Sequence, residues 1–171
     1  MPTVSNSTSD LLSRLSGIVH VHDRGIEIVD AQRLRADGIR DLAWTAAFAT
    51  DPGTIEAAQW IVWEAAQQLG ARSASIHELY MARARGEING FTVPAINIRA
   101  QTFDMARIAY ETATTFDVGA LILELARSEQ TYTFQRPIDF ATAVLAGAVA
   151  AGWRGPVFLQ GDHYQFNMKK Y

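Results

Sequence analysis

The stretch Ala120-Leu121-Ile122-Leu123-Glu124-Leu125 is an apolar run that only Glu124 interrupts. A short run of this kind is typical of a strand that is buried on both faces, as strands are in parallel sheets. Parallel strands are joined by crossover segments that are usually helical, so the flanking sequence should alternate between helix and strand. The run therefore predicts an α/β fold.

The segments on either side follow this alternation. Before the run, residues 91–96 are apolar and β-prone, and residues 102–116 repeat apolar side chains at helical spacing. After it, residues 138–153 form an Ala-rich segment that Pro137 begins and Gly152 ends, and residues 157–160 are again short and apolar. Strand, helix, strand, helix, strand at this spacing predicts βαβ units with a sheet of three parallel strands.

Two regions of different character make up the chain. Residues 1–74 are expected to form a mostly helical N-terminal extension, with a short strand at 26–29 and an amphipathic helix at 54–69. Residues 75–171 contain the predicted βαβ units, and Ser75-Ile76-His77-Glu78 has the capping-box pattern that begins a helix, here expected to run to about Gly86. Only about ten residues follow the last predicted strand, so we expect a fold that is truncated at its C-terminus.

The composition excludes several classes of function. The 171 residues suffice for one sizeable domain, and the formal net charge of −3 gives no basic excess for nucleic acid or anionic lipid. The absence of cysteine excludes disulfides, Cys-type zinc sites and thiol nucleophiles. Polar residues interrupt every apolar stretch, and the first ten residues do not have the pattern of a signal peptide. We therefore expect a cytoplasmic protein that binds neither nucleic acid nor membranes.

Polar residues follow each of the three predicted strands, where the loops of βα folds collect functional groups. The sharpest signal is Gly161-Asp162-His163, because an imidazole can bind a divalent metal and an adjacent carboxylate can move a proton. Catalytic zinc typically takes three protein ligands, however, so one histidine is not a site. The alternative is that Asp162 caps a following helix and His163 makes a local hydrogen bond.

Three motifs resemble those of one enzyme family. Gly90-Phe91-Thr92-Val93-Pro94-Ala95-Ile96-Asn97 is similar to the "aromatic-x-V-P-A-x-N" first strand of class II fructose-bisphosphate and tagatose-bisphosphate aldolases. The preceding segment 78–86 resembles the helix that enters the barrel in that family. Residues 156–163, Pro-Val-Phe-Leu-Gln-Gly-Asp-His, resemble its "P-V-x-L-H-x-D-H" strand. The motifs occur in the order and at about the spacing of the family, and they cover roughly residues 75–167.

The resemblance implies the first part of a (β/α)8 TIM barrel and a zinc-dependent aldol cleavage. The family splits a ketose bisphosphate between C3 and C4 into dihydroxyacetone phosphate and an aldehyde, and the metal acts as a Lewis acid. By this resemblance His163 would be a metal ligand, Asp162 the catalytic acid/base, and Asn97 a contact to the triose part of the substrate. Ser128 would bind near the phosphate or the dihydroxyacetone end, although its alignment needs a small insertion. Family members commonly form homo-oligomers.

The chain also departs from the family pattern. Gln160 stands where the family has the first histidine of "H-x-D-H", and the two later metal histidines and the Gly-rich phosphate loops would lie beyond Tyr171. Glu124 and the loop 128–130 are also similar to the non-catalytic subunit of tagatose-bisphosphate aldolase, a barrel that supports a catalytic partner. Three hypotheses therefore stay open: an incomplete aldolase, a supporting subunit, and an α/β fragment without activity that tends to associate.

The remaining histidines and arginines are less specific. His20 and His22 would share one face of a strand and form either a metal-binding pair or a solvated pair. His77 is expected on a helix surface. Arg127 and Arg136 are either phosphate partners or solvated surface charges.

Overall fold

The computed structural model describes residues 2–164, so Met1 and residues 165–171 lie outside the description that follows. The N-terminal region contains a small antiparallel hairpin and several helices. Its elements are α1 (Thr8–Arg14), β1 (Val19–His22), β2 (Gly25–Ile28), α2 (Ala31–Arg33), a π-helical segment η1 (Leu34–Gly38), α3 (Ile39–Phe48) and α4 (Pro52–Leu69). Asp51 caps α4 through a hydrogen bond from the Thr54 amide (2.8 Å), and Gly70 ends it in the left-handed conformation.

The second region alternates strands and helices. Its elements are β3 (Ala71–Ala74), α5 (His77–Ala84), β4 (Ala95–Asn97), α6 (Thr102–Thr115), β5 (Ile122–Ala126), α7 (Arg127–Thr133), α8 (Pro137–Ala150) and β6 (Gly155–Asp162). The predicted α/β class is thereby confirmed. The predicted strand at 120–125 corresponds to β5, and the predicted helices at 102–116 and 138–153 correspond to α6 and α8.

The sheet has four parallel strands in the order β3-β6-β5-β4, and not the three that were expected. The three strands β4, β5 and β6 lie side by side in chain order. The strand β3 pairs with the free side of β6, where Ala71 lies opposite Gly155. The sheet therefore includes residues 71–74 from the region that was expected to be a helical extension. The sheet and the apolar core both include residues from each side of residue 74. The division into two regions at this residue therefore stays a prediction from the sequence.

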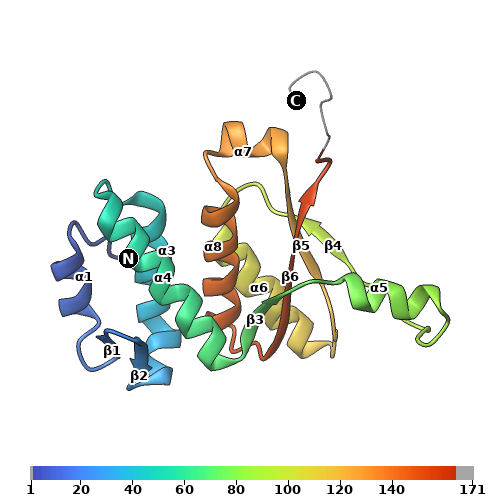
Figure 1. The fold of residues 1–171 in the computed structure, drawn as a ribbon, viewed down its shortest axis with the longest axis horizontal. Helices are drawn as coiled ribbons and strands as arrows, with labels where there is room; N and C mark the ends of the chain where they lie inside the picture. Colours follow the sequence, from blue (N-terminus) through green and yellow to red (C-terminus); the bar gives the residue numbers. More distant parts are fainter. Residues whose placement is uncertain (1, 165–171) are drawn as a thin grey trace.

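One face of the sheet is covered by helices (Figure 1). Leu123 and Leu125 of β5 and Val157 of β6 are buried in the same apolar cluster as α6 and α8. The helix α8 also packs on α3 and α4, so it lies between the sheet and the N-terminal helices. It approaches α6 closely at Gly147, where an added Cβ would lie 2.8 Å from the Phe103 carbonyl oxygen. A single core therefore holds both regions together.

The opposite face of the sheet carries the polar side chains. Successive residues of a strand alternate between faces, so Ile122, Glu124 and Ala126 point away from the side on which Leu123 and Leu125 lie. The helix α5 projects from this part of the molecule (Figure 1), and none of its residues is buried. Tyr80 and Met81 on α5 are 48% and 40% exposed. On this face Ile122 and Ala126 are buried, whereas Glu124 is only half-buried, and α5 is the part of the molecule that is least covered.

Two local predictions were wrong in detail. The strand expected at 91–96 begins only at Ala95, because Pro94 has no amide hydrogen for a sheet ladder; Phe91 is instead 41% exposed. The capping box at Ser75 does not form, since Ile76 is the cap residue and the Ser75 hydroxyl accepts a hydrogen bond from the nearer His77 amide at 3.2 Å.

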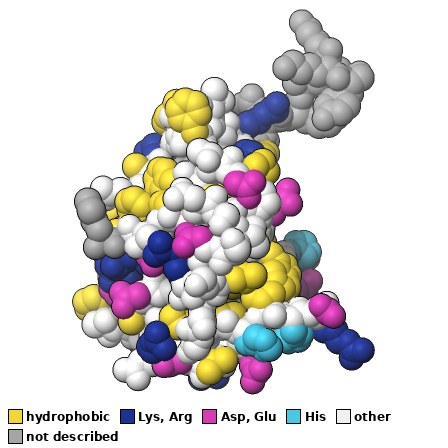
Figure 2. All heavy atoms as spheres, turned by 90° about the vertical axis from the view of Figure 1, so that its left-hand side faces the viewer, with side chains coloured by type: hydrophobic (Ala, Val, Ile, Leu, Met, Phe, Trp, Pro, Cys, Tyr) yellow, Lys and Arg dark blue, Asp and Glu magenta, His cyan; other side chains and the backbone are white. Residues whose placement is uncertain are grey.

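Residues 2–164 contain no helix with the length and apolar character needed to cross a membrane. On the N-terminal side of the molecule, basic and acidic side chains are interspersed, and neither sign forms a large area on the face that Figure 2 shows. This distribution agrees with the small net charge of −3.

Candidate functional site

The carboxyl edge of the sheet brings polar side chains of three strands together. Asn97 at the end of β4 pairs in register with Glu124 of β5, and Glu124 pairs with Gln160 of β6. Residues that are paired in parallel strands point to the same face, so these three side chains form a row across the face opposite α6 and α8. Asp162 lies two residues after Gln160 on the same face of β6, in register with Ala126. The edge is thus polar where the strands end, as the sequence predicts.

Three of the four predicted site residues lie close together. The side-chain amide Nδ2 of Asn97 donates to Asp162 Oδ2 over 3.5 Å, although the two residues are far apart in the chain. His163 Nε2 lies 3.4 Å from Asp162 Oδ1. The His163 side chain is 82% exposed, whereas that of Asp162 is 27% exposed. Asp162 is therefore the central member, with an amide on one side and an imidazole on the other.

Ser128 lies at the same edge but outside this cluster. It is the second residue of α7, directly after β5, and it is exposed. The structure shows no hydrogen bond from its side chain to the described residues, so its predicted contact to substrate stays a prediction.

A buried carboxylate, Glu129, organises the loops beneath these groups. Glu129 is 5% exposed, and its carboxylate accepts hydrogen bonds from the Ala126 amide (2.9 Å) and Arg99 Nε (2.5 Å). Burial by itself would raise the pKa of Glu129, but hydrogen bonds from Ala126, Asn97 and Arg99 outweigh it and lower the pKa. Glu129 therefore connects the loop after β4, through Arg99, with the end of β5.

The sequence interpretation missed this role of Glu129. The available signal was a glutamate three residues after the end of a strand, which is the capping position for a following helix. Ala126 stands at the cap itself and has no hydroxyl, so the usual capping pattern was incomplete.

Glu124 differs from Glu129 in its electrostatics. Burial and then the nearby Asp162 carboxylate raise the pKa of Glu124 above its ordinary value. The Gln160 side-chain amide donates to Glu124 Oε2 over 3.3 Å. The edge of the sheet therefore carries carboxyl and amide groups that can form hydrogen bonds with the hydroxyl groups of a ligand.

The described residues do not supply a complete metal site. Within residues 2–164, no three His, Asp or Glu side chains converge as metal ligands do, whereas catalytic zinc takes three protein ligands. His163 alone presents an imidazole at this edge. His20 and His22 have ring centroids 6.3 Å apart on β1, and His20 Nδ1 lies 4.0 Å from Glu27 Oε2, but they belong to the N-terminal hairpin. His77 is exposed on α5.

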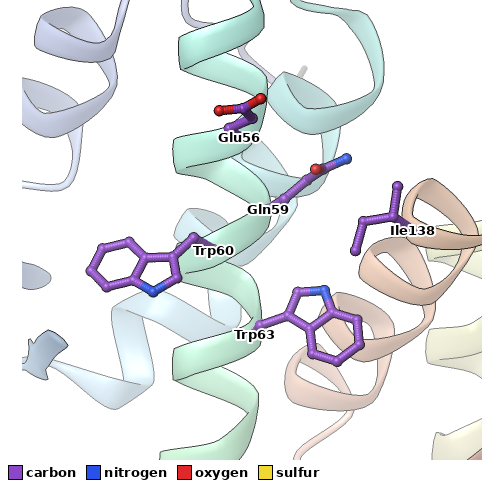
Figure 3. A pocket seen from close by; sticks show the side chains of 5 residues that line it. All are labelled: Glu56, Gln59, Trp60, Trp63 and Ile138. Carbon is purple, nitrogen blue, oxygen red and sulfur yellow. The ribbon is translucent and has the colours of Figure 1, made fainter.

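A second surface feature is an apolar groove between α4 and α8 (Figure 3). Trp63 points toward α8, and its Nε1 donates to Thr142 Oγ1 over 3.1 Å, while Trp60 points to the other side of α4. Ile138 of α8 and Gln59 of α4 complete the wall. This groove contains none of the predicted site residues.

Comparison of the chain with protein-family models, with curated proteins and with solved structures finds no match. The fold and the site together define an α/β protein with a polar cluster at the carboxyl edge of a parallel sheet.

Proposed function

We propose that this chain is an aldolase-like protein that binds a phosphorylated ketose at the carboxyl edge of its sheet. The reaction would be that of class II fructose-bisphosphate aldolases, namely reversible cleavage to dihydroxyacetone phosphate and an aldehyde. The observation that carries the proposal is the contact between Asn97 and Asp162, with His163 beside them. These residues come from the two segments whose motifs resemble the aldolase family.

The chemistry of the edge suits a hydroxylated ligand. Asn97 Oδ1 is buried and accepts no hydrogen bond from the described residues. An unpaired buried acceptor is costly, so a ligand hydroxyl that reaches it would stabilise the complex. Asp162 would accept the proton of the C4 hydroxyl while the C3–C4 bond breaks and its electron pair stays on the C3 side. Asn97 would hold the triose part during this step.

The metal of the family would stabilise the negative charge that develops on the triose part. Residues 2–164 do not by themselves form a site for that metal, because catalytic zinc takes three protein ligands and His163 supplies only one imidazole. The roles of Asp162 and Asn97 in binding and proton transfer do not depend on which other groups hold it.

The arrangement of strands supports a barrel as the larger architecture of this proposal. The strands β4, β5 and β6 are adjacent in chain order, as consecutive strands of a (β/α)8 barrel are. In a barrel, the strand that follows β6 would pair with the side of β6 on which β3 lies here. The barrel proposal therefore requires β3 to leave this position when a further strand is present.

Cleavage of fructose 1,6-bisphosphate by the purified chain tests the function. Dihydroxyacetone phosphate is measured with a coupled dehydrogenase, with added Zn²⁺ and with a chelator. Because the described residues leave the metal site incomplete, we expect zinc-dependent cleavage only where further ligands complete it, and Asp162→Asn should then lower the activity by about 10² to 10⁴-fold, the usual contribution of a general acid or base. Asp23→Asn, in the exposed turn of the N-terminal hairpin, is the matched control and should retain activity. Activity that survives Asp162→Asn would refute the assignment.

A specific contact favours a second candidate, a non-catalytic subunit that supports an aldolase partner. Gln160 replaces a histidine of the family motif, and its amide is engaged by Glu124. A supporting subunit should co-purify with a second aldolase-like chain and bind no zinc alone. Stoichiometric zinc on the isolated chain would exclude this candidate.

A further inference from the structure

A hollow beside α7 forms a second polar site. Its volume is about 390 Å³, and its walls come from α7, from the connection after it and from the start of α8. The lining residues are Arg127, Gln130, Thr131, Phe134, Gln135 and Arg136. None of Asn97, Asp162 and His163 lines it, so this hollow is separate from the cluster described above.

Two walls of the hollow are held in place by other parts of the protein. The Gln135 side chain accepts a hydrogen bond from Thr102 Oγ1 (2.6 Å) and donates one to the Arg99 carbonyl oxygen (3.3 Å). Arg136 donates from Nε and Nη2 to the two carboxylate oxygens of Asp139, both over 2.9 Å. Gln135 and Arg136 are therefore fixed before any ligand binds, which lowers the entropic cost of the contacts that they make.

Arg127 gives the hollow its charge. The Arg136 guanidinium is neutralised by Asp139, whereas Arg127 is exposed and forms no ion pair with the described residues. A guanidinium presents its donors in a planar fork that matches two oxygens of a phosphate group. The Thr131 hydroxyl is a further donor in the same wall. The hollow is therefore suited to an anion with several oxygens.

Phe134 gives the hollow an aromatic surface in an unusual conformation. Its φ of 55° lies in the left-handed region, which is costly for a bulky side chain, and its side chain is 90% exposed. Phe134 is the residue that ends α7, where a left-handed conformation is common, and its ring lies in solvent beside the hollow rather than in the core. An exposed ring next to arginine is a surface on which a flat ligand can stack.

We propose that this hollow binds an organic phosphate joined to a flat ring, which is the chemistry of a nucleotide. The phosphate pairs with Arg127, and the ring stacks on Phe134. The fixed side chains of Gln135 and Arg136 shape the space between them. This inference does not depend on the aldolase proposal, because the two sites share no side chain.

Binding of adenosine monophosphate to the purified full chain, measured by calorimetry, tests the inference, with inorganic phosphate and adenosine as partial ligands. The nucleotide should bind about tenfold or more tightly than either partial ligand, since one stacked ring and one paired phosphate each contribute to affinity. Arg127→Gln and Phe134→Gly should each weaken binding by about tenfold. Phe134→Gly should also raise the unfolding temperature, because glycine adopts positive φ without strain.

Matched controls separate the ring and the charge from general surface effects. Phe116 is 73% exposed and Arg24 is exposed in the hairpin turn, so Phe116→Ala and Arg24→Gln should bind the nucleotide as the original chain does. Phe134→Leu keeps apolar bulk without an aromatic face, and it should also lose affinity. Equal affinity for nucleotide and inorganic phosphate, or unchanged binding in Arg127→Gln, would overturn the inference. Asp162→Asn should bind the nucleotide normally; lost binding there would place the ligand at the sheet edge and also overturn it.

Discussion

The substitution Gly147→Ala should loosen the helical layer that supports the sheet. An added Cβ at this position of α8 would lie 2.8 Å from Arg107 N and from the Phe103 carbonyl oxygen, and 2.9 Å from Ala106 Cβ. Two of these atoms belong to the backbone of α6, which cannot rotate away as a side chain does. The two helices must therefore separate by several tenths of an ångström or more.

The expected loss of stability follows from two opposing effects. Alanine in place of glycine in a helix favours folding by about 1 kcal/mol, whereas overpacking a core costs about 1–3 kcal/mol. Because backbone atoms make the contact, we expect the upper end of that cost and a net loss of about 1–2 kcal/mol in the free energy of unfolding. The helix α6 follows β4 and α8 precedes β6, so separation of these helices should also displace Asn97 from Asp162.

Urea unfolding followed by tryptophan fluorescence measures this loss. Gly53→Ala is the matched control, because Gly53 is also helical and its added Cβ would meet Asp51 Oδ2 at an ordinary 3.5 Å. The control should leave stability unchanged or raise it by up to about 1 kcal/mol. A Gly147→Ala chain that unfolds at the urea concentration of the original would refute the close crossing of α6 and α8.

Three further substitutions probe buried polar groups, and urea or thermal unfolding measures each. Tyr110 Oη is buried without a hydrogen-bond partner among the described residues, and burial raises the pKa of this hydroxyl. Because Tyr110→Phe removes an unpaired polar atom, it should leave stability unchanged or raise it by up to about 1 kcal/mol. Burial opposes the ionisation of Glu129, but hydrogen bonds from Ala126, Asn97 and Arg99 outweigh it and lower its pKa. The stability that this carboxylate contributes is therefore present above its unfolded-state pKa and is lost as pH falls through its folded-state pKa. Glu129→Gln should destabilise the chain at neutral pH and have a smaller effect in acid. Burial and the Asp162 carboxylate raise the pKa of Glu124. The stability that this group contributes is therefore present below its unfolded-state pKa and is lost as pH rises through its folded-state pKa. The Glu124→Gln chain should be more stable than the original at neutral pH and equally stable in acid.

The sequence predicted the central strands and helices because their burial leaves a regular pattern. The strand β5 is apolar nearly throughout since both faces are covered, and α6 and α8 show helical periodicity or an Ala-rich composition. The strand β3 was missed for the opposite reason. Its residues 72–74 are exposed at the edge of the sheet, so Ala71-Arg72-Ser73-Ala74 lacks the apolar signal of a strand. Edge position therefore explains the missing fourth strand.

The candidate site was predictable where it follows from strand direction. Parallel strands end at one edge, so the strand ends that carry Asn97 and Asp162 were expected to lie side by side, whereas the roles of these two residues were implied by the resemblance to the aldolases. The contact of Arg99 with Glu129 was not predictable, because it joins two loops whose relative course no residue spacing defines. Glu129 would also be expected on a surface, since a carboxylate is seldom buried without partners.

The lengths of the hydrogen bonds at the sheet edge bear on whether it binds a ligand. The bond from Arg99 to Glu129 is 2.5 Å long and buried on the carboxylate side, which is typical of a contact that maintains structure. The bonds from Asn97 to Asp162 (3.5 Å) and from Gln160 to Glu124 (3.3 Å) are longer than the usual 2.7–3.2 Å. Weak bonds between these side chains can be exchanged for bonds to ligand hydroxyls at small cost. Glu129 is therefore the firmly held carboxylate of this edge, and the longer bonds leave Asn97, Glu124 and Gln160 as the side chains from which a ligand contact is expected.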